Sequence, residues 1–122
     1  MQSPASSQHQ MFDQLKKSMH EVLKGWQSRA VPERTMLMQL HLFRAALQQS
    51  GGEIWRALEV VLLQALAGLA AQYEQDAQLL RRSFLAMEMK HKIATDLNIA
   101  ETTVYRWQDV ALIRLTNVLL EL

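Results

Sequence analysis

The chain has 122 residues, a formal net charge of +1 at pH 7 and no cysteine. That length corresponds to one domain that can bury a core without covalent staples. The lack of cysteine excludes disulfide bonds and thiolate metal sites, which fits a reducing compartment. The near-neutral charge argues against a strong nonspecific nucleic-acid binder, because such proteins carry a clear basic excess.

The first ten residues, MQSPASSQHQ, are polar and include Pro4 and three serines. We expect residues 1–10 to form a disordered arm, and they lack the basic-then-apolar order of a secretory signal peptide. A helix is predicted over 11–26, because apolar residues recur there every three or four positions. Gly25 and the segment 28–32 end it.

Two more helices are predicted in the N-terminal half. The second helix has Pro32 in its first turn, where proline is favourable. A Ser-Gly-Gly sequence at 50–52 ends it. The third, over 53–73, is apolar on most sides, which is typical of a helix at the centre of a bundle or against a partner chain. Its most apolar part, 57–71, is too short and too polar for a membrane span of about 20 residues, so we expect a soluble, cytoplasmic protein with no membrane partner.

A fourth helix is predicted over about 75–87, and the segment 90–109, KHKIATDLNIAETTVYRWQD, has the spacing of two short helices that cross at a sharp angle. The apolar pattern then continues to the last residue, and no strand-like alternation appears. The sequence therefore predicts an all-α helical bundle, with a three-helix region over 11–74 packed on a C-terminal trihelical helix-turn-helix region over 75–122.

Four positions define the predicted helix-turn-helix. Ala94 is small enough to let the second helix approach closely, and Asn98 lies at the turn, because Asn tolerates left-handed backbone better than most residues. Val104 and Trp107 are three residues apart and bury the inner face of the second helix, so we expect Trp107 to be a core residue rather than a base contact. The predicted outer face carries Glu101, Thr102, Thr103, Tyr105, Arg106 and Gln108.

The segment IATDLNIAETTVYRWQDVALIRL, with its I-A-x-x-L-x-I pattern followed by T-V, resembles the helix-turn-helix of sigma factor region four. Relatives of that family include LuxR-type response regulators and phage regulators of the ArpU type. The upstream LLRRSFLAM resembles the helix that precedes the motif, and the resemblance covers about 76–122. Two positions depart from the family: Ala100 stands where a capping Ser is usual, which weakens the helix start by about 1 kcal/mol, and Asn98 stands where Gly is common.

The resemblance implies a DNA-binding transcriptional regulator whose second motif helix enters the major groove of double-stranded DNA. Arg106 is the best candidate for a guanine edge or a phosphate, since Arg pairs bidentately with guanine. Thr102 and Thr103 lie at the helix start, where free backbone N–H groups favour phosphate; capping of the helix itself is the alternative role. The predicted DNA-binding residues are Arg81, Arg82, Lys90, Lys92, Thr102, Thr103, Tyr105, Arg106 and Gln108.

A second function class stays open on grounds of charge. The part from Asp76 to the end holds six basic and six acidic residues, so one copy neutralises few phosphates and we expect DNA affinity to need a homodimer. The dimer is predicted to form through the 53–73 helix or the 110–122 tail. Sigma-like helix-turn-helix units also serve as adaptor modules beside signalling ATPases, so the alternative is a protein-binding adaptor, including the N-terminal part of such an ATPase.

Enzymatic function is not predicted. The four histidines, His9, His20, His41 and His91, never fall three or four residues apart, so no metal site is expected. The chain has no glycine-rich phosphate loop and no nucleophile motif, and we expect no cofactor.

Overall fold

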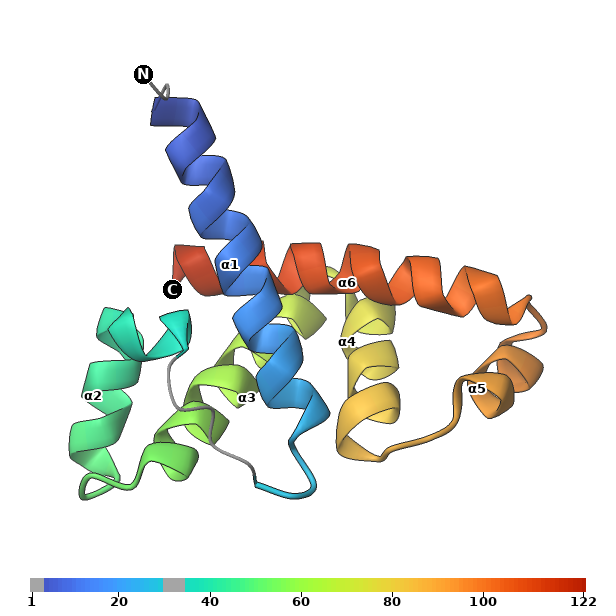
Figure 1. The fold of residues 1–122 in the computed structure, drawn as a ribbon. Helices are drawn as coiled ribbons and strands as arrows, with labels where there is room; N and C mark the ends of the chain where they lie inside the picture. Colours follow the sequence, from blue (N-terminus) through green and yellow to red (C-terminus); the bar gives the residue numbers. More distant parts are fainter. Residues whose placement is uncertain (1–3, 30–34) are drawn as a thin grey trace.

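The computed structural model describes residues 4–29 and 35–122, and in this part of the chain every regular element is helical, as predicted (Figure 1). A 3-10 turn, η1 (Met36–Gln39), precedes α2, and a π-helical segment, η2 (Arg81–Leu85), continues α4. The six α-helices are α1 (Pro4–Lys24), α2 (His41–Gln49), α3 (Ile54–Gln72), α4 (Glu74–Leu80), α5 (Lys90–Leu97) and α6 (Glu101–Glu121).

The predicted disordered arm over 1–10 is helical from Pro4 onward, so that expectation is wrong for its described part. Proline is accommodated there because the N–H groups of a first helical turn have no intrahelical partner. The N-terminal half of α1 projects beyond the rest of the bundle in Figure 1. His9 and Gln10, at the end of the predicted arm, are exposed on this helix.

The second predicted helix is divided in two. Leu40 has extended backbone (φ −72°, ψ 141°), which ends η1 and serves as the N-cap of α2. Pro32, the expected helix start, lies outside the described residues. The predicted stop is confirmed, because Gly51 and Gly52 both have positive φ (67° and 89°), a conformation that costs other residues energy.

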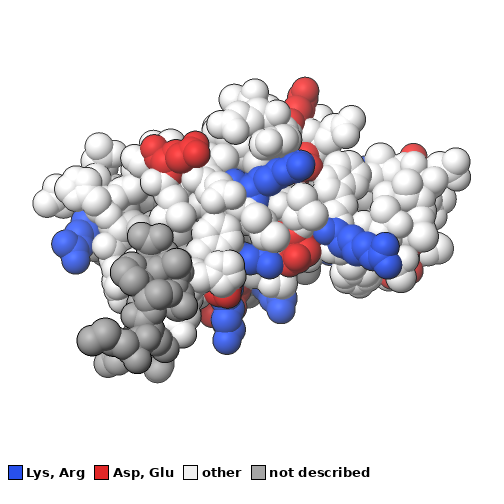
Figure 2. Space-filling view, turned by 90° about the horizontal axis from the view of Figure 1, so that it is seen from above, with Lys and Arg blue, Asp and Glu red and all other residues white. Residues whose placement is uncertain are grey.

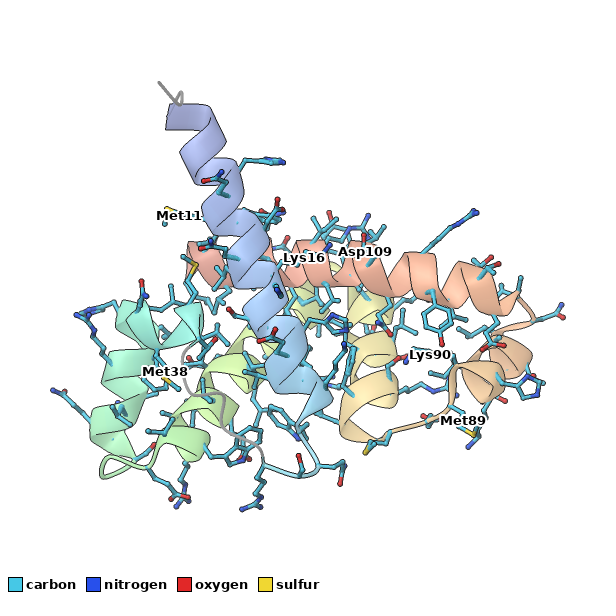
Figure 3. The ribbon with its side chains drawn as sticks, in the orientation of Figure 1. Met11, Lys16, Met38, Met89, Lys90 and Asp109 are labelled. Atoms are coloured by element: carbon cyan, nitrogen blue, oxygen red, sulfur yellow. The ribbon has the colours of Figure 1, made fainter. Side chains whose placement is uncertain are left out.

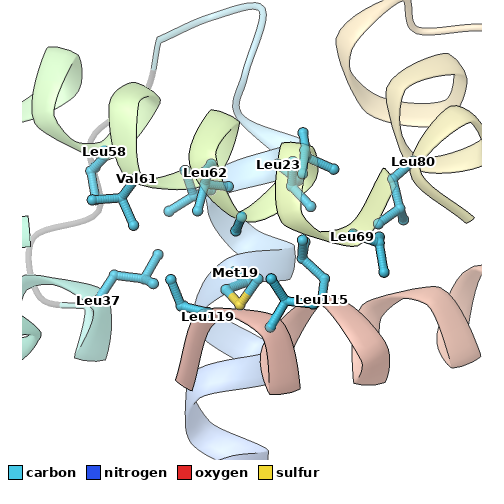
Figure 4. Close-up of a cluster of buried hydrophobic side chains, with 14 of the residues drawn as sticks. Met19, Leu23, Leu37, Leu58, Val61, Leu62, Leu69, Leu80, Leu115 and Leu119 are labelled. Atoms are coloured by element: carbon cyan, nitrogen blue, oxygen red, sulfur yellow. The ribbon is translucent and has the colours of Figure 1, made fainter. Parts of the chain in front are cut away.

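The main core lies where α3, α1 and α6 meet (Figure 4). α3 is central, as its all-round apolar surface predicts, and α6 contacts α1, α3, α4 and α5 along its length. Met19 of α1, Leu62 of α3 and Leu115 of α6 are fully buried in this core. α6 therefore connects the N-terminal helices to the predicted DNA-binding region.

α3 is, by length and composition alone, apolar enough to cross a membrane, contrary to the expectation from its sequence. The core helix of a soluble protein has the same composition. Eight residues of α3 are buried by the other helices, which accounts for its apolar character within the bundle. Gly68 of α3 lies against Val118 of α6, so close that a Cβ at Gly68 would come within 2.8 Å of Val118 Cγ1.

Candidate nucleic-acid interface

The connection between α5 and α6 is a tight turn centred on Asn98. This residue has left-handed backbone (φ 55°, ψ 46°), as predicted, and ends α5. The N–H groups of Asn98 and Ile99 donate to the carbonyls of Thr95 and Ala94, at 3.2 and 3.0 Å. These bonds satisfy the free carbonyls at the end of α5.

A second, smaller hydrophobic cluster lies beside this turn. Leu79 of α4, Ile93 and Ala94 of α5 and Val104 of α6 form its buried part, and Ile99 packs against them. Ala94 is only 6% exposed, so its predicted burial is confirmed. Three helices thus share one small core, which fixes the start of α6 relative to α4 and α5.

Trp107 is half-buried in this cluster rather than fully enclosed. Its indole N–H donates to Asp76 Oδ1 at 2.6 Å, and Arg114 donates to Asp76 Oδ2 at 2.8 Å. The Arg114 guanidinium also lies 4.0 Å from the centre of the Tyr73 ring. No local sequence pattern predicts this contact between α4 and α6, because Asp76 precedes Trp107 by 31 residues.

Four of the five predicted contact residues on α6 lie on its exposed side. Thr102, Thr103, Tyr105 and Arg106 are all solvent-accessible. Gln108 is 9% exposed, so its predicted outward position is wrong. The reason is helical phase: Gln108 follows Val104 by four residues and lies only about 40° from it around the helix, on the face that packs against the bundle.

Two of the four basic residues expected at the phosphates are engaged within the protein. Arg82 makes a bidentate pair with Glu88 (2.8 and 2.9 Å) and also donates to Asp96 at 2.6 Å. The hydrogen bonds with Glu88 raise the pKa of Arg82 above its ordinary value and lower that of Glu88. Lys92 also pairs with Glu88, at 3.5 Å. Through Glu88, these cations hold the segment before α5 against η2 and α5.

Lys90 and Arg81, unlike Arg82 and Lys92, make no ion pair among the described residues. Lys90 Nζ lies 5.4 Å from the Phe84 ring centre and 5.9 Å from that of Tyr105, and burial lowers its pKa. Figure 3 shows it at the start of α5, between α4 and α5. Arg81 is exposed, and among the described residues it has no ion-pair partner. Of the four cations, Arg81 is thus the one that is both exposed and without an ion-pair partner among the described residues.

The surface charge is mixed elsewhere as well. Figure 2 shows basic and acidic groups interspersed over the face that contains α1 and α6. An ion pair joins α1 to α6: Lys16 Nζ lies 2.6 Å from Asp109 Oδ1 (Figure 3). In the described residues no three His, Asp or Glu side chains come close enough to share a metal ion.

Comparisons with protein-family models, with curated proteins and with solved structures found no match.

Proposed function

We propose that α4 with η2, α5 and α6 form a trihelical helix-turn-helix unit that binds double-stranded DNA and regulates transcription. The single observation that carries the proposal is the exposed side of the α6 start. Thr102, Tyr105 and Arg106 are accessible there, on a helix held in place by the Trp107–Asp76 hydrogen bond. A rigid helix start with accessible polar side chains is what major-groove insertion requires.

Base contacts in this proposal belong to Arg106, which has no ion-pair partner among the described residues. Phosphate contacts belong to Arg81 and to the first N–H groups of α6, since the N-cap residue Ala100 provides no side-chain acceptor for them. Arg82 and Lys92 support the fold instead, because Glu88 already neutralises part of their charge.

One copy makes few phosphate contacts and should therefore bind DNA weakly. For this reason we propose that the chain binds DNA as a homodimer, in the cytoplasm. The end of α6 offers apolar surface for it, as Leu120 and Leu122 are 55% and 59% exposed. α3 is the poorer candidate of the two helices named from the sequence, because most of its apolar side chains are already buried.

A protein-binding adaptor is the second candidate, and a specific observation favours it. Met87 and Met89, in the connection before α5, are 60% and 75% exposed, and Tyr105 nearby is 54% exposed. Exposed methionines and an aromatic ring are typical of protein contact surfaces. The ion pairs of Arg82 reduce the local positive charge at the same time.

The experiment is a selection of duplexes from a random-sequence library by the full-length chain. We expect a defined motif to be enriched, and Arg106→Ala to lower affinity for it by about 1–3 kcal/mol, the cost of one lost base contact. Arg44→Ala is the matched control, because Arg44 is an exposed arginine on α2, at the opposite end of the bundle from α5 (Figure 1). Enrichment of no sequence, together with capture of a protein partner that Arg106→Ala abolishes, would replace the DNA proposal with the adaptor.

A further inference from the structure

A cavity of about 450 Å³ lies between α1, η2, the connection before α5 and the start of α6. Its apolar wall is formed by Leu23, Phe84 and Met87. Two cations, Lys24 and Lys90, also line it, and no carboxylate does. The volume is within the range of sites for small molecules.

Lys90 is the unusual group in this lining. Its ammonium lies near the Phe84 and Tyr105 rings and is partly desolvated, yet no described carboxylate pairs with it. A charge removed from water is costly unless it is paired, and ring faces compensate only part of that cost. An anion in the cavity would supply the missing counter-charge.

Two polar side chains on the same lining also lack partners. Ser83 is 8% and Gln108 is 9% exposed, and the Ser83 hydroxyl oxygen and Gln108 Oε1 are buried without a hydrogen bond. Buried polar groups without partners are uncommon and costly. A hydroxyl can donate to a ligand anion, and an amide oxygen can accept from a ligand hydroxyl.

We propose that this cavity is a binding site for a small aromatic carboxylate that carries a hydroxyl group. The carboxylate pairs with Lys90 at the edge of the cavity, with Lys24 adding positive charge. The ring packs on Leu23, Phe84 and Met87, which line the cavity, and the ligand hydroxyl donates to the unpartnered Gln108 Oε1. Tyr105 belongs both to this lining and to the exposed face of α6, but the proposal does not depend on DNA binding.

The test is isothermal titration calorimetry of the full-length chain with 4-hydroxybenzoate, and with 4-hydroxybenzamide as the neutral compound of the same shape. We expect one site for 4-hydroxybenzoate, with affinity at least about tenfold above that for the amide, because the charge-assisted contact is lost. Lys90→Gln should remove this preference. Lys92→Gln is the matched control, because Lys92 is on the same helix but does not line the cavity.

Amide chemical-shift changes locate the site even if Lys90→Gln folds poorly. In the unsubstituted protein, 4-hydroxybenzoate should shift the signals of Leu23, Ser83 and Met87 and leave those of Phe12 and Leu120, at the other end of the bundle, unchanged. Equal affinity for acid and amide, shifts confined to other residues, or no binding at millimolar concentration would each overturn the proposal.

Discussion

The indole N–H of Trp107 and the carboxylate of Asp76 form a 2.6 Å hydrogen bond that joins α6 to α4. Asp76 is 3% exposed, and the same carboxylate accepts a hydrogen bond from Arg114. The bond therefore fixes the rotation of α6 about its own axis, and with it the direction in which Tyr105 and Arg106 point.

Trp107→Phe should destabilise the protein by about 1.5–3 kcal/mol, the net contribution of a hydrogen bond to a charged group. The variant removes the N–H donor together with part of the indole, so the loss of ring volume must be subtracted with a control. Chemical denaturation measures it, and Trp26→Phe is the matched control, because no hydrogen bond of the Trp26 indole is present among the described residues. Equal losses for both variants would show that ring volume, not the bond to Asp76, matters.

Gly68→Ala should destabilise the protein although alanine favours helices. The added Cβ would lie 2.8 Å from Val118 Cγ1, and a buried β-branched side chain has little freedom to move away. Overpacking of this kind costs about 1–3 kcal/mol, against about 1 kcal/mol gained in helix propensity. Thermal unfolding measures the balance, and adding Val118→Ala should recover part of the loss. A clear gain in stability for Gly68→Ala alone would contradict the close approach of α3 and α6.

The fold was predictable because apolar residues recur at helical spacing in nearly every segment, and because Gly51, Gly52 and Asn98 mark turns by their backbone preferences. The break at Leu40 was not, since leucine carries no turn preference and the interruption depends on packing. Within the candidate site, Gln108 was misplaced because its polarity suggested exposure, whereas its helical phase places it inside.

The ion pair of Arg82 with Asp96 and the bond between Asp76 and Trp107 were missed for a different reason. They join residues of different helices that only the tertiary fold brings together. Sequence spacing identified which cations lie near the motif, but whether a cation is free or paired depends on carboxylates from other elements. Whether a cation is free or paired determines how much positive charge is available to bind the phosphates of DNA.

Stability should fall as the pH is lowered from 7.5 to about 5.5, a window around the ordinary histidine pKa of about 6.5. Burial, followed by the charges of Lys24, Lys16 and Lys90, lowers the pKa of His20 in the folded protein, while Asp109 opposes them. The unfolded chain therefore binds the proton more readily. Stability is at its full value above the unfolded pKa and is lost as the pH falls through it toward the folded pKa.

Denaturation at a series of pH values measures this dependence. His20→Gln should flatten the profile in that window, because the group that titrates differently in the two states is gone. His41→Gln is the matched control for the substitution itself, since His41 is exposed on α2, away from α1. A profile that His20→Gln does not alter would rule out His20 as its source.

Arg81→Gln should weaken binding to all duplexes about equally and reduce the slope of log affinity against log salt by about one. Arg82→Gln should change that slope less, because two carboxylates already neutralise the Arg82 guanidinium. Fluorescence anisotropy at several salt concentrations gives both slopes. The reverse order would mean that DNA displaces Glu88 and Asp96 from Arg82.

The most direct measurement of the central claim is binding of the full-length chain to a random-sequence duplex at low salt, followed by titration with salt. The exposed start of α6, together with Arg81 and Arg106, which make no ion pair within residues 4–29 and 35–122, predicts measurable binding. That binding should fall steeply between about 50 and 200 mM salt, as counterions compete for the phosphates. No binding at the lowest salt concentration would contradict DNA recognition by this face of α6.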